Sequence, residues 1–285
     1  MKKQLIYGGV IITLLAACNG STPPANAPAG TEAAKDTSKK MTEGHKMNEL
    51  AEFEFTTLVG NIHSPLEIIG ILPKTNVVFD KKFVNPTENE NKYTTTTRKA
   101  LNYGVYLVDL VYLSTNDQTS SLKSFFMTSR NLAKSLECAE TFDRIAGSRA
   151  EKNIDKKDSI NKIMDQLFAD MDKYLKSNER LLVSTQILVG SWVESQYITV
   201  NALKGVTRAK ENEALFQKLG QQNFTIDKLN EIFKEFKNEK EFVPVMNGVQ
   251  ELGKIYSQIH NGQIDAALMD KLAQKLAEVR SKLTN

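Results

Sequence analysis

The chain has 285 residues, of which 37 are basic and 34 acidic, so its formal net charge is only +3. Basic and acidic residues are interspersed along the chain, and no run of them forms the concentrated basic face that a nucleic-acid-binding protein needs. Two cysteines are too few for a disulfide scaffold or for a zinc site built on several cysteines.

The first element in the chain has the pattern of a secretory signal peptide. Lys2 and Lys3 precede a mostly apolar run from Leu5 to Ala17. This run is too short to span a membrane as a helix, which takes roughly 20 apolar residues. A basic start, a short apolar run and small residues at its end predict a signal peptide over residues 1–17. Its removal takes away both lysines and no acid, so the remaining chain is nearly neutral.

The signal peptide ends in Leu15, Ala16, Ala17 and Cys18. These four residues resemble the lipobox of bacterial lipoproteins. The resemblance implies diacylation of Cys18, cleavage before it and acylation of the new N-terminus. Because each buried CH₂ contributes about 0.8 kcal/mol, two or three acyl chains would hold a soluble domain on a membrane. The alternative is an ordinary signal peptide whose cleavage site lies beside a cysteine.

The residue after Cys18 and the segment that follows bear on location. In the sorting rule known for such lipoproteins, an Asp directly after the lipidated cysteine retains the protein in the inner membrane. Asn19 occupies this position instead. The cell envelope, and within it the outer membrane, is therefore the expected location, on either face. Residues 18–47 are rich in Pro, Ala, Thr and Ser and have almost no large apolar residue, so they predict a disordered tether. His45 lies in this tether and is not expected to belong to a metal site.

Residues 48–285 have the pattern of a single all-α domain. Apolar residues recur at helical spacing in most segments, which favours about nine to ten helices. No mark recurs at a fixed period, so an irregular multi-helix bundle or an αα array without sequence repeat is expected. Val77–Phe79 is the only candidate strand. The helical segments are residues 48–58, 65–72, 92–113, 117–138, 142–150, 158–175, 180–203, 211–219, 226–236, 241–260 and 263–283, with Ser64, Asp158 and Thr225 as expected N-caps.

Two of these helices are apolar on nearly all sides, which is typical of helices buried among other helices. They are the segment from Ala100 to Leu113 and the one from Arg180 to Leu203. The second is as long as a membrane span, but polar residues spread along it favour a core helix. Cys138, placed by its pattern in a helix, is expected to be small and buried rather than reactive.

Each buried helix carries one acid beside aromatic residues and a glycine that allows close approach of helices. In the first, Tyr106, Asp109 and Tyr112 lie three residues apart, so both phenols flank the carboxylate. The second contains a matching set, namely Trp192, Glu194 and Tyr197.

These acids have three interpretations. Asp109 and Glu194 could face each other across a pocket lined by the four aromatic residues, which would suit a cationic or sugar-like ligand. As acids they could also act in general acid–base catalysis. The favoured interpretation is structural, because a buried carboxylate must be satisfied by Tyr hydroxyls or by an arginine. The arginines considered for this role are Arg98, Arg130, Arg144 and Arg180.

The same two segments carry a second resemblance. Their sequences are YGVYLVDLVYLS and GSWVESQYI. They resemble an uncharacterised family of exported all-helical bacterial lipoproteins, in which a helix with Tyr and Asp is followed by a Gly-x-Trp-x-Glu-x-x-Tyr helix. The family has no known activity, so the resemblance implies no catalytic residue. Ser191 stands where the pattern often has a second Gly, which predicts a slightly wider contact between the helices.

The expected function follows from the anchor and from the motifs that the chain lacks. It has no nucleophile elbow, phosphate-binding loop or zinc-protease motif, and its folded part contains only His63 and His260. We expect a membrane-tethered, non-enzymatic helical lipoprotein that binds an envelope protein or a small molecule, with no cofactor or metal. The alternatives are an envelope hydrolase that uses Asp109 and Glu194, or a structural spacer.

Overall fold

The computed structural model describes residues 49–75, 77–147, 149, 152–153 and 156–285. The predicted signal peptide, the predicted lipidation site Cys18 and the predicted tether lie outside these residues. The described residues contain helices, turns and coil but no strand, which confirms the all-α class. Val77–Phe79 is coil rather than a strand. The described helices belong to one contact unit, Glu43–Asn285, within which they share one hydrophobic core.

The helices follow the expected order along the chain. The short 3₁₀ helices η2 to η5 are Leu72–Lys74, Lys81–Phe83, Thr87–Lys92 and Lys234–Phe236. The α-helices are α1 Glu49–Gly60, α2 Pro65–Ile71, α3 Thr96–Thr115, α4 Thr119–Ser135, α5 Ala139–Ile145, α7 Lys157–Ser177, α8 Leu181–Leu203, α9 Glu213–Gly220, α10 Gln222–Phe233, α11 Val243–Tyr256 and α12 Ala266–Thr284.

Of the three predicted N-caps, one is confirmed and two are wrong, so two helices begin earlier than expected. Ser64 does cap α2, since its side chain accepts a hydrogen bond from the backbone N–H of Leu66. Asp158 is not a cap, because α7 already begins at Lys157. Thr225 is wrong in the same way, because α10 begins at Gln222 and buries this threonine within the helix. Both errors arise because, in the sequence, a polar residue inside the first turn of a helix looks the same as an N-cap residue just before the helix.

Cys138 lies between two helices rather than inside one. The chain leaves α4 through Glu137, whose φ of 57° is left-handed, and Cys138 is the residue before α5. Its side chain is nevertheless only 2% exposed. Burial raises the pKa of the Cys138 thiol to about 11, so it behaves as a small apolar residue, as expected.

The centre of the fold is the pair α3 and α8, which run in the same direction and touch at their backbones. A Cβ atom added to Gly190 would lie 1.9 Å from the carbonyl oxygen of Leu101, and one added to Gly104 would lie 2.2 Å from that of Ile187. The hydroxyl of Ser191 lies at this contact, 2.9 Å from the carbonyl oxygen of Ile187 in its own helix and 3.1 Å from that of Gly104 in α3. That this serine widens the contact relative to a glycine stays a prediction.

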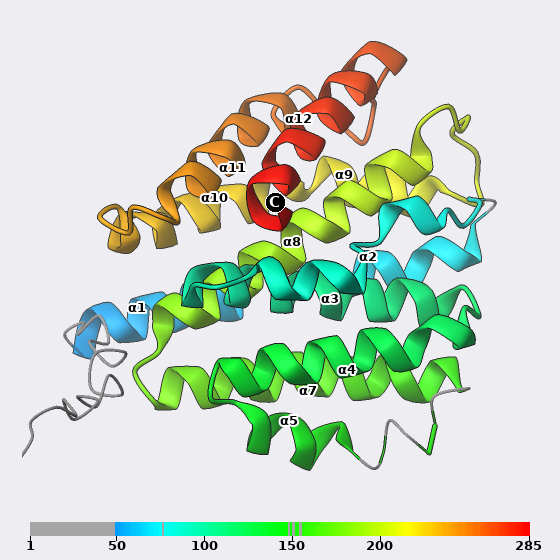
Figure 1. Cartoon of the computed structure of the whole chain (residues 1–285). Coiled ribbons are helices and arrows are strands. Elements are labelled where there is room, and N and C mark those ends of the chain that lie inside the picture. The colour runs from blue at the N-terminus through cyan, green and yellow to red at the C-terminus, as the bar shows by residue number, and fades with distance from the viewer. Residues whose placement is uncertain (1–48, 76, 148, 150–151, 154–155) are drawn as a thin grey trace, which may run out of the picture. The chain divides into compact units, whose positions relative to one another are not determined.

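The other helices cover this pair on two sides (Figure 1). Helices α4, α5 and α7 form one side, where α4 and α7 both contact α3. On the other side α2 and α12 contact both central helices, and α11, α10 and α9 follow outward from them. Nearly every residue of α8 is buried, in agreement with the expected core helix.

One described stretch, Phe53–Lys74, is long and apolar enough to cross a membrane, by length and composition only. Its most apolar part has a mean hydropathy of 1.2 and is 33% buried. Within it the chain ends α1 at Gly60 and starts α2 at Pro65. The break gives two short helices that pack on different neighbours, α1 on α10 and α2 on α8.

Candidate functional site

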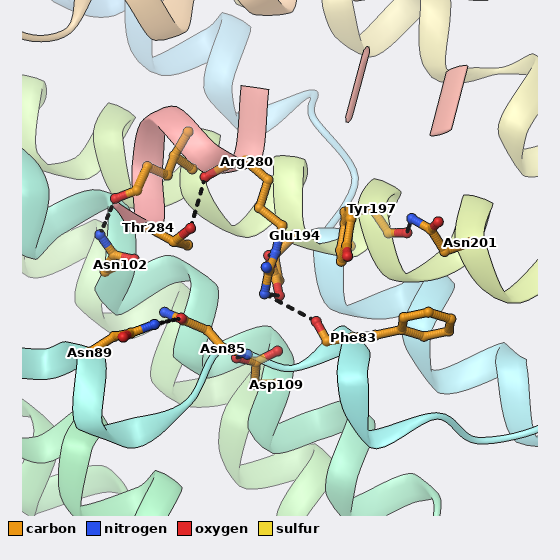
Figure 2. Close-up of polar contacts among 12 residues, drawn as sticks. Phe83, Asn85, Asn89, Asn102, Asp109, Glu194, Tyr197, Asn201, Arg280 and Thr284 are labelled. Carbon is orange, nitrogen blue, oxygen red and sulfur yellow. Dashed lines mark hydrogen bonds and ion pairs between the residues drawn. The ribbon is translucent and has the colours of Figure 1, made fainter. Parts of the chain in front are cut away.

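Three helices bring two acids and one arginine together in the core (Figure 2). Arg280, on α12, donates two hydrogen bonds to Glu194, on α8, with lengths of 2.6 and 2.7 Å. The same guanidinium donates a third bond of 3.1 Å to the carbonyl of Phe83. Glu194 has no exposed side-chain surface and the side chain of Arg280 is 14% exposed. Such a two-pronged arginine–carboxylate pair is the strongest common form of ion pair.

Asp109, on α3, is the second acid of this group. One of its oxygens accepts a hydrogen bond of 3.0 Å from the backbone N–H of Asn85. Its carboxyl group lies close to that of Glu194. Burial, and then the charge of Glu194, raise the pKa of Asp109 well above its ordinary value, against the opposing effect of Arg280.

The two carboxyl oxygens of Asp109 differ in their surroundings. Oδ2 accepts the bond from Asn85, whereas Oδ1 has no hydrogen-bond partner among the described residues. Because the raised pKa of Asp109 favours its protonated form, we infer that the pair carries one negative charge, which the guanidinium of Arg280 offsets. Although burial would lower the pKa of Arg280, the charge of Glu194 raises it.

The two acids thus lie side by side, but they do not open onto a pocket. Asp109 and Glu194 are both 0% exposed, so neither carboxyl group can be reached by solvent. Asn85 bonds to Asp109 and Arg280 bonds to Glu194, so each acid already has a partner within the protein. In the part of the chain that the structure describes, this arrangement is a closed polar link between helices.

Tyr106 and Tyr112 flank Asp109 on α3, but their hydroxyls are occupied elsewhere. The hydroxyl of Tyr106 donates a bond of 2.8 Å to the carbonyl of Pro86, and that of Tyr112 accepts one of 3.0 Å from the N–H of Asp80. Burial raises the pKa of Tyr112 to about 12. Both tyrosines therefore hold the irregular segment 80–86 against α3, which places Asn85 over Asp109.

The aromatic residues of α8 point in two directions. The ring of Tyr197 lies under the guanidinium of Arg280, 4.4 Å from its carbon, so this tyrosine supports the ion pair. Trp192 lies away from the acids, and its indole N–H donates a bond of 2.8 Å to the side-chain oxygen of Gln222 on α10. The four aromatic residues consequently do not line one common pocket.

The sequence did not single out Arg280 or Asn85. Arg280 has a detectable signal, because it stands among the buried Leu276, Val279 and Leu283 on the inner face of α12, where a charge needs a partner. Three of the arginines considered instead have other partners. They are Arg130 with Asp143 at 2.6 Å, Arg98 with Glu241 at 3.8 Å, and Arg180 with the carbonyl of Leu136 at 2.7 Å. Asn85 uses its backbone, so its residue type carries no signal.

A cavity lies on the side of α8 that Trp192 faces. Its volume is about 320 Å³, and α2, α8, α9 and α10 form its walls. Trp192 is the predicted site residue that lines it, beside the side chains of Gln196, Gln222 and Thr225. A second cavity of about 230 Å³ between α1, α7 and α8 is lined mainly by apolar residues and by none of the predicted ones.

Among the described residues, no three His, Cys, Asp or Glu side chains gather in a group that could hold a metal ion. No family model, curated protein or solved structure matches the chain. The resemblance to exported helical lipoproteins therefore stays a prediction from the two motifs.

Proposed function

We propose that this protein is a lipid-anchored helical module of the cell envelope, in the outer membrane, which binds a partner or a small molecule and catalyses no reaction. The anchor half of this proposal rests on residues 15–18 and on the Pro-rich segment after them. Cys18 lies outside the described residues, whose first helix begins at Glu49.

The observation that carries the non-enzymatic half is the closed state of the Asp109–Glu194 pair. General acid–base catalysis needs the acid within hydrogen-bonding distance of the substrate. Both carboxyl groups are 0% exposed, and they are bonded to Arg280 or to Asn85. A hydrolase would have to break this network before it could bind a substrate, so the arrangement favours a structural role for the acids.

The 320 Å³ cavity supports the binding half. Small-molecule sites are concave and combine apolar walls with a few fixed polar groups. The cavity beside Trp192 has this character, whereas the region around the two acids does not. A pure spacer has no need of such a cavity.

The anchor is tested by labelling cells with an alkyne analogue of palmitate. We expect the wild-type protein to be labelled and to sediment with membranes. A Cys18→Ser variant should lose the label and move to the soluble fraction, because no acyl chain then holds it. Cys138→Ser removes the other cysteine and should change neither result. Label retained on Cys18→Ser would contradict the proposal.

The non-enzymatic half is tested by incubating the purified protein with envelope glycans and peptides. We expect no turnover by the wild type. The hydrolase alternative predicts products that disappear in an Asp109→Asn variant whose melting temperature is unchanged. Those products would overturn our proposal, because a closed structural pair cannot account for them.

A further inference from the structure

We propose that the cavity between α2, α8 and α10 binds a neutral ligand the size of one sugar ring, through hydroxyl groups on the ligand. The inference rests on the proposed function as a binding module and names the site and the class of ligand. It concerns the cavity lined by Trp192, Gln196, Gln221, Gln222 and Thr225, with Phe224 at its mouth.

The volume sets the size of the ligand. At about 320 Å³ the cavity lies at the lower end of small-molecule sites, which span roughly 300 to 1,000 Å³. It has room for roughly ten water molecules, at about 30 Å³ each. One hexose ring with its substituents fits this space, whereas a chain of several sugars does not.

The charges around the cavity favour a neutral ligand. Lys218 and Glu67 both line it, and the ammonium nitrogen of the lysine lies 2.9 Å from a carboxylate oxygen of the glutamate. The two charges cancel, so neither is left for a ligand of opposite sign. Binding a charged ligand would break this pair or leave a like charge beside it.

The polar groups of the cavity are held in place by their neighbours. The side-chain oxygen of Gln222 accepts from Trp192, and its nitrogen donates a bond of 2.9 Å to the carbonyl of Lys218. The oxygen of Gln196 accepts a bond of 2.8 Å from the hydroxyl of Tyr256. Each amide nitrogen carries two hydrogens, so the glutamines can offer further donors whose direction is already fixed, which lowers the entropic cost of binding.

Hydroxyl groups match this lining best. A hydroxyl both donates and accepts hydrogen bonds, and so do the side chains of Thr225 and Gln221. Phe224, 56% exposed at the mouth, adds an apolar wall on which the C–H face of a sugar ring can lie. Its own ring is covered on one side by Lys228, whose ammonium is 4.2 Å from the ring centre.

Trp192 is the only tryptophan of the chain, so its fluorescence reports directly on this cavity. The full-length protein, in a detergent without a sugar headgroup, is titrated with N-acetylglucosamine, cationic glucosamine and anionic glucuronate. We expect a saturable change in emission with the neutral sugar and at least about tenfold weaker binding of both charged sugars. Isothermal titration calorimetry provides a second readout that is independent of the indole.

A matched pair of variants places the binding in this cavity. Gln221→Phe puts a bulky ring at the exposed rim, and we expect it to weaken binding at least about tenfold. Gln217→Phe makes the same exchange at an exposed residue of α9 that does not line the cavity, and it should bind like the wild type. Circular dichroism shows that both variants are folded.

Three results would overturn the inference. They are no saturable response to the neutral sugar at tens of millimolar, equal affinity for the charged sugars, and unchanged binding by Gln221→Phe. None of them bears on the lipid label at Cys18 or on the turnover assay. Failure of this site and failure of the proposed function are therefore distinguishable.

Discussion

At the scale of single residues, a protonated acid makes the buried charge cluster stable. Two ionised carboxylates beside one arginine would leave a net charge in the core, which is costly. With a proton on Asp109, which its raised pKa favours, one negative charge faces one positive charge. Asp109, Glu194 and Arg280 come from α3, α8 and α12, so this one arrangement links three helices.

The proton on Asp109 makes stability depend on pH. Its pKa is raised in the folded state above the ordinary 3.8, so above about pH 4 the folded protein holds a proton that the unfolded chain releases. The free energy of unfolding contributed by this group is therefore complete at low pH and is lost as the pH rises through the raised pKa. Asp109→Asn, whose amide copies the protonated acid, removes this loss.

Urea denaturation of both proteins from about pH 4 to about pH 9 checks this sign. We expect the free energy of unfolding of Asp109→Asn, relative to the wild type, to increase steadily with pH. A difference that stays constant over the range would show that Asp109 is ionised in the folded protein.

Removing both acids that lie near Arg280 should strongly lower the free energy of unfolding. In Glu194→Gln alone, Asp109 can ionise and take over as the partner of the arginine. The double variant with Asp109→Asn leaves the guanidinium unpaired, and breaking a buried pair costs about 3–5 kcal/mol. We expect this loss in urea denaturation, larger than the sum of the single changes. Glu251→Gln, which removes an exposed partner of Lys275, is the control and should change nothing measurable.

At the scale of elements, the contact between α3 and α8 depends on the absence of two side chains. Gly104 and Gly190 each face a backbone carbonyl of the other helix at a distance that no Cβ atom tolerates. A backbone carbonyl cannot turn aside as a side chain can, so the helix itself must move. At the same contact the hydroxyl of Ser191 lies within hydrogen-bonding distance of the carbonyl of Gly104.

Gly190→Ala should therefore destabilise the protein. Forcing a methyl group into this contact is an overpacking change, which typically costs about 1–3 kcal/mol. Gly70→Ala is the matched control, because nothing lies within 4 Å of the added carbon in α2. An alanine at this position lowers the conformational entropy of the unfolded chain, which should stabilise the protein by about 0.4–1 kcal/mol. Equal melting temperatures for the two variants would show that α3 and α8 separate at low cost.

At the scale of the whole molecule, the described helices share one core. The buried apolar residues form a single cluster that extends from α1 to α12, and α3 and α8 contribute to both sides of it. A core that is continuous across all helices favours unfolding as one unit.

This continuity predicts one transition in urea. Far-UV circular dichroism follows all helices, whereas fluorescence follows Trp192 between α8 and α10. We expect both signals to change with the same midpoint, because neither side of the α3–α8 pair can unfold and leave the other intact. Two separate midpoints would divide the described part of the chain into independent domains.

The apolar periodicity was sufficient for the helices and their order. The two segments that are apolar all round became the central pair, because no other position removes every side of a helix from water. The ends of helices were less predictable, as Asp158 and Thr225 show. A cap is decided by one backbone hydrogen bond, which several polar residues near a helix start can make equally well.

The candidate site was predictable only in part. Asp109 and Glu194 stood out because a single acid in an apolar helix is unusual, and the structure places them together. Their partner Arg280 comes from a helix 86 residues further along the chain than Glu194. The cavity also escaped the sequence, because its lining combines α2, α8, α9 and α10 and ordinary residues such as glutamine.

By itself, then, the sequence determined the all-helical class, the order of the helices, the two central ones and the presence of acids that need partners. These properties depend on local spacing and on the cost of burying a charge. Only the tertiary structure decided which arginine satisfies Glu194, that burial raises the pKa of Asp109, and that the cavity lies beside Trp192 rather than between the acids. These features depend on how closely helices that are far apart in the sequence pack in space. The spacing of residues along the chain does not give those distances.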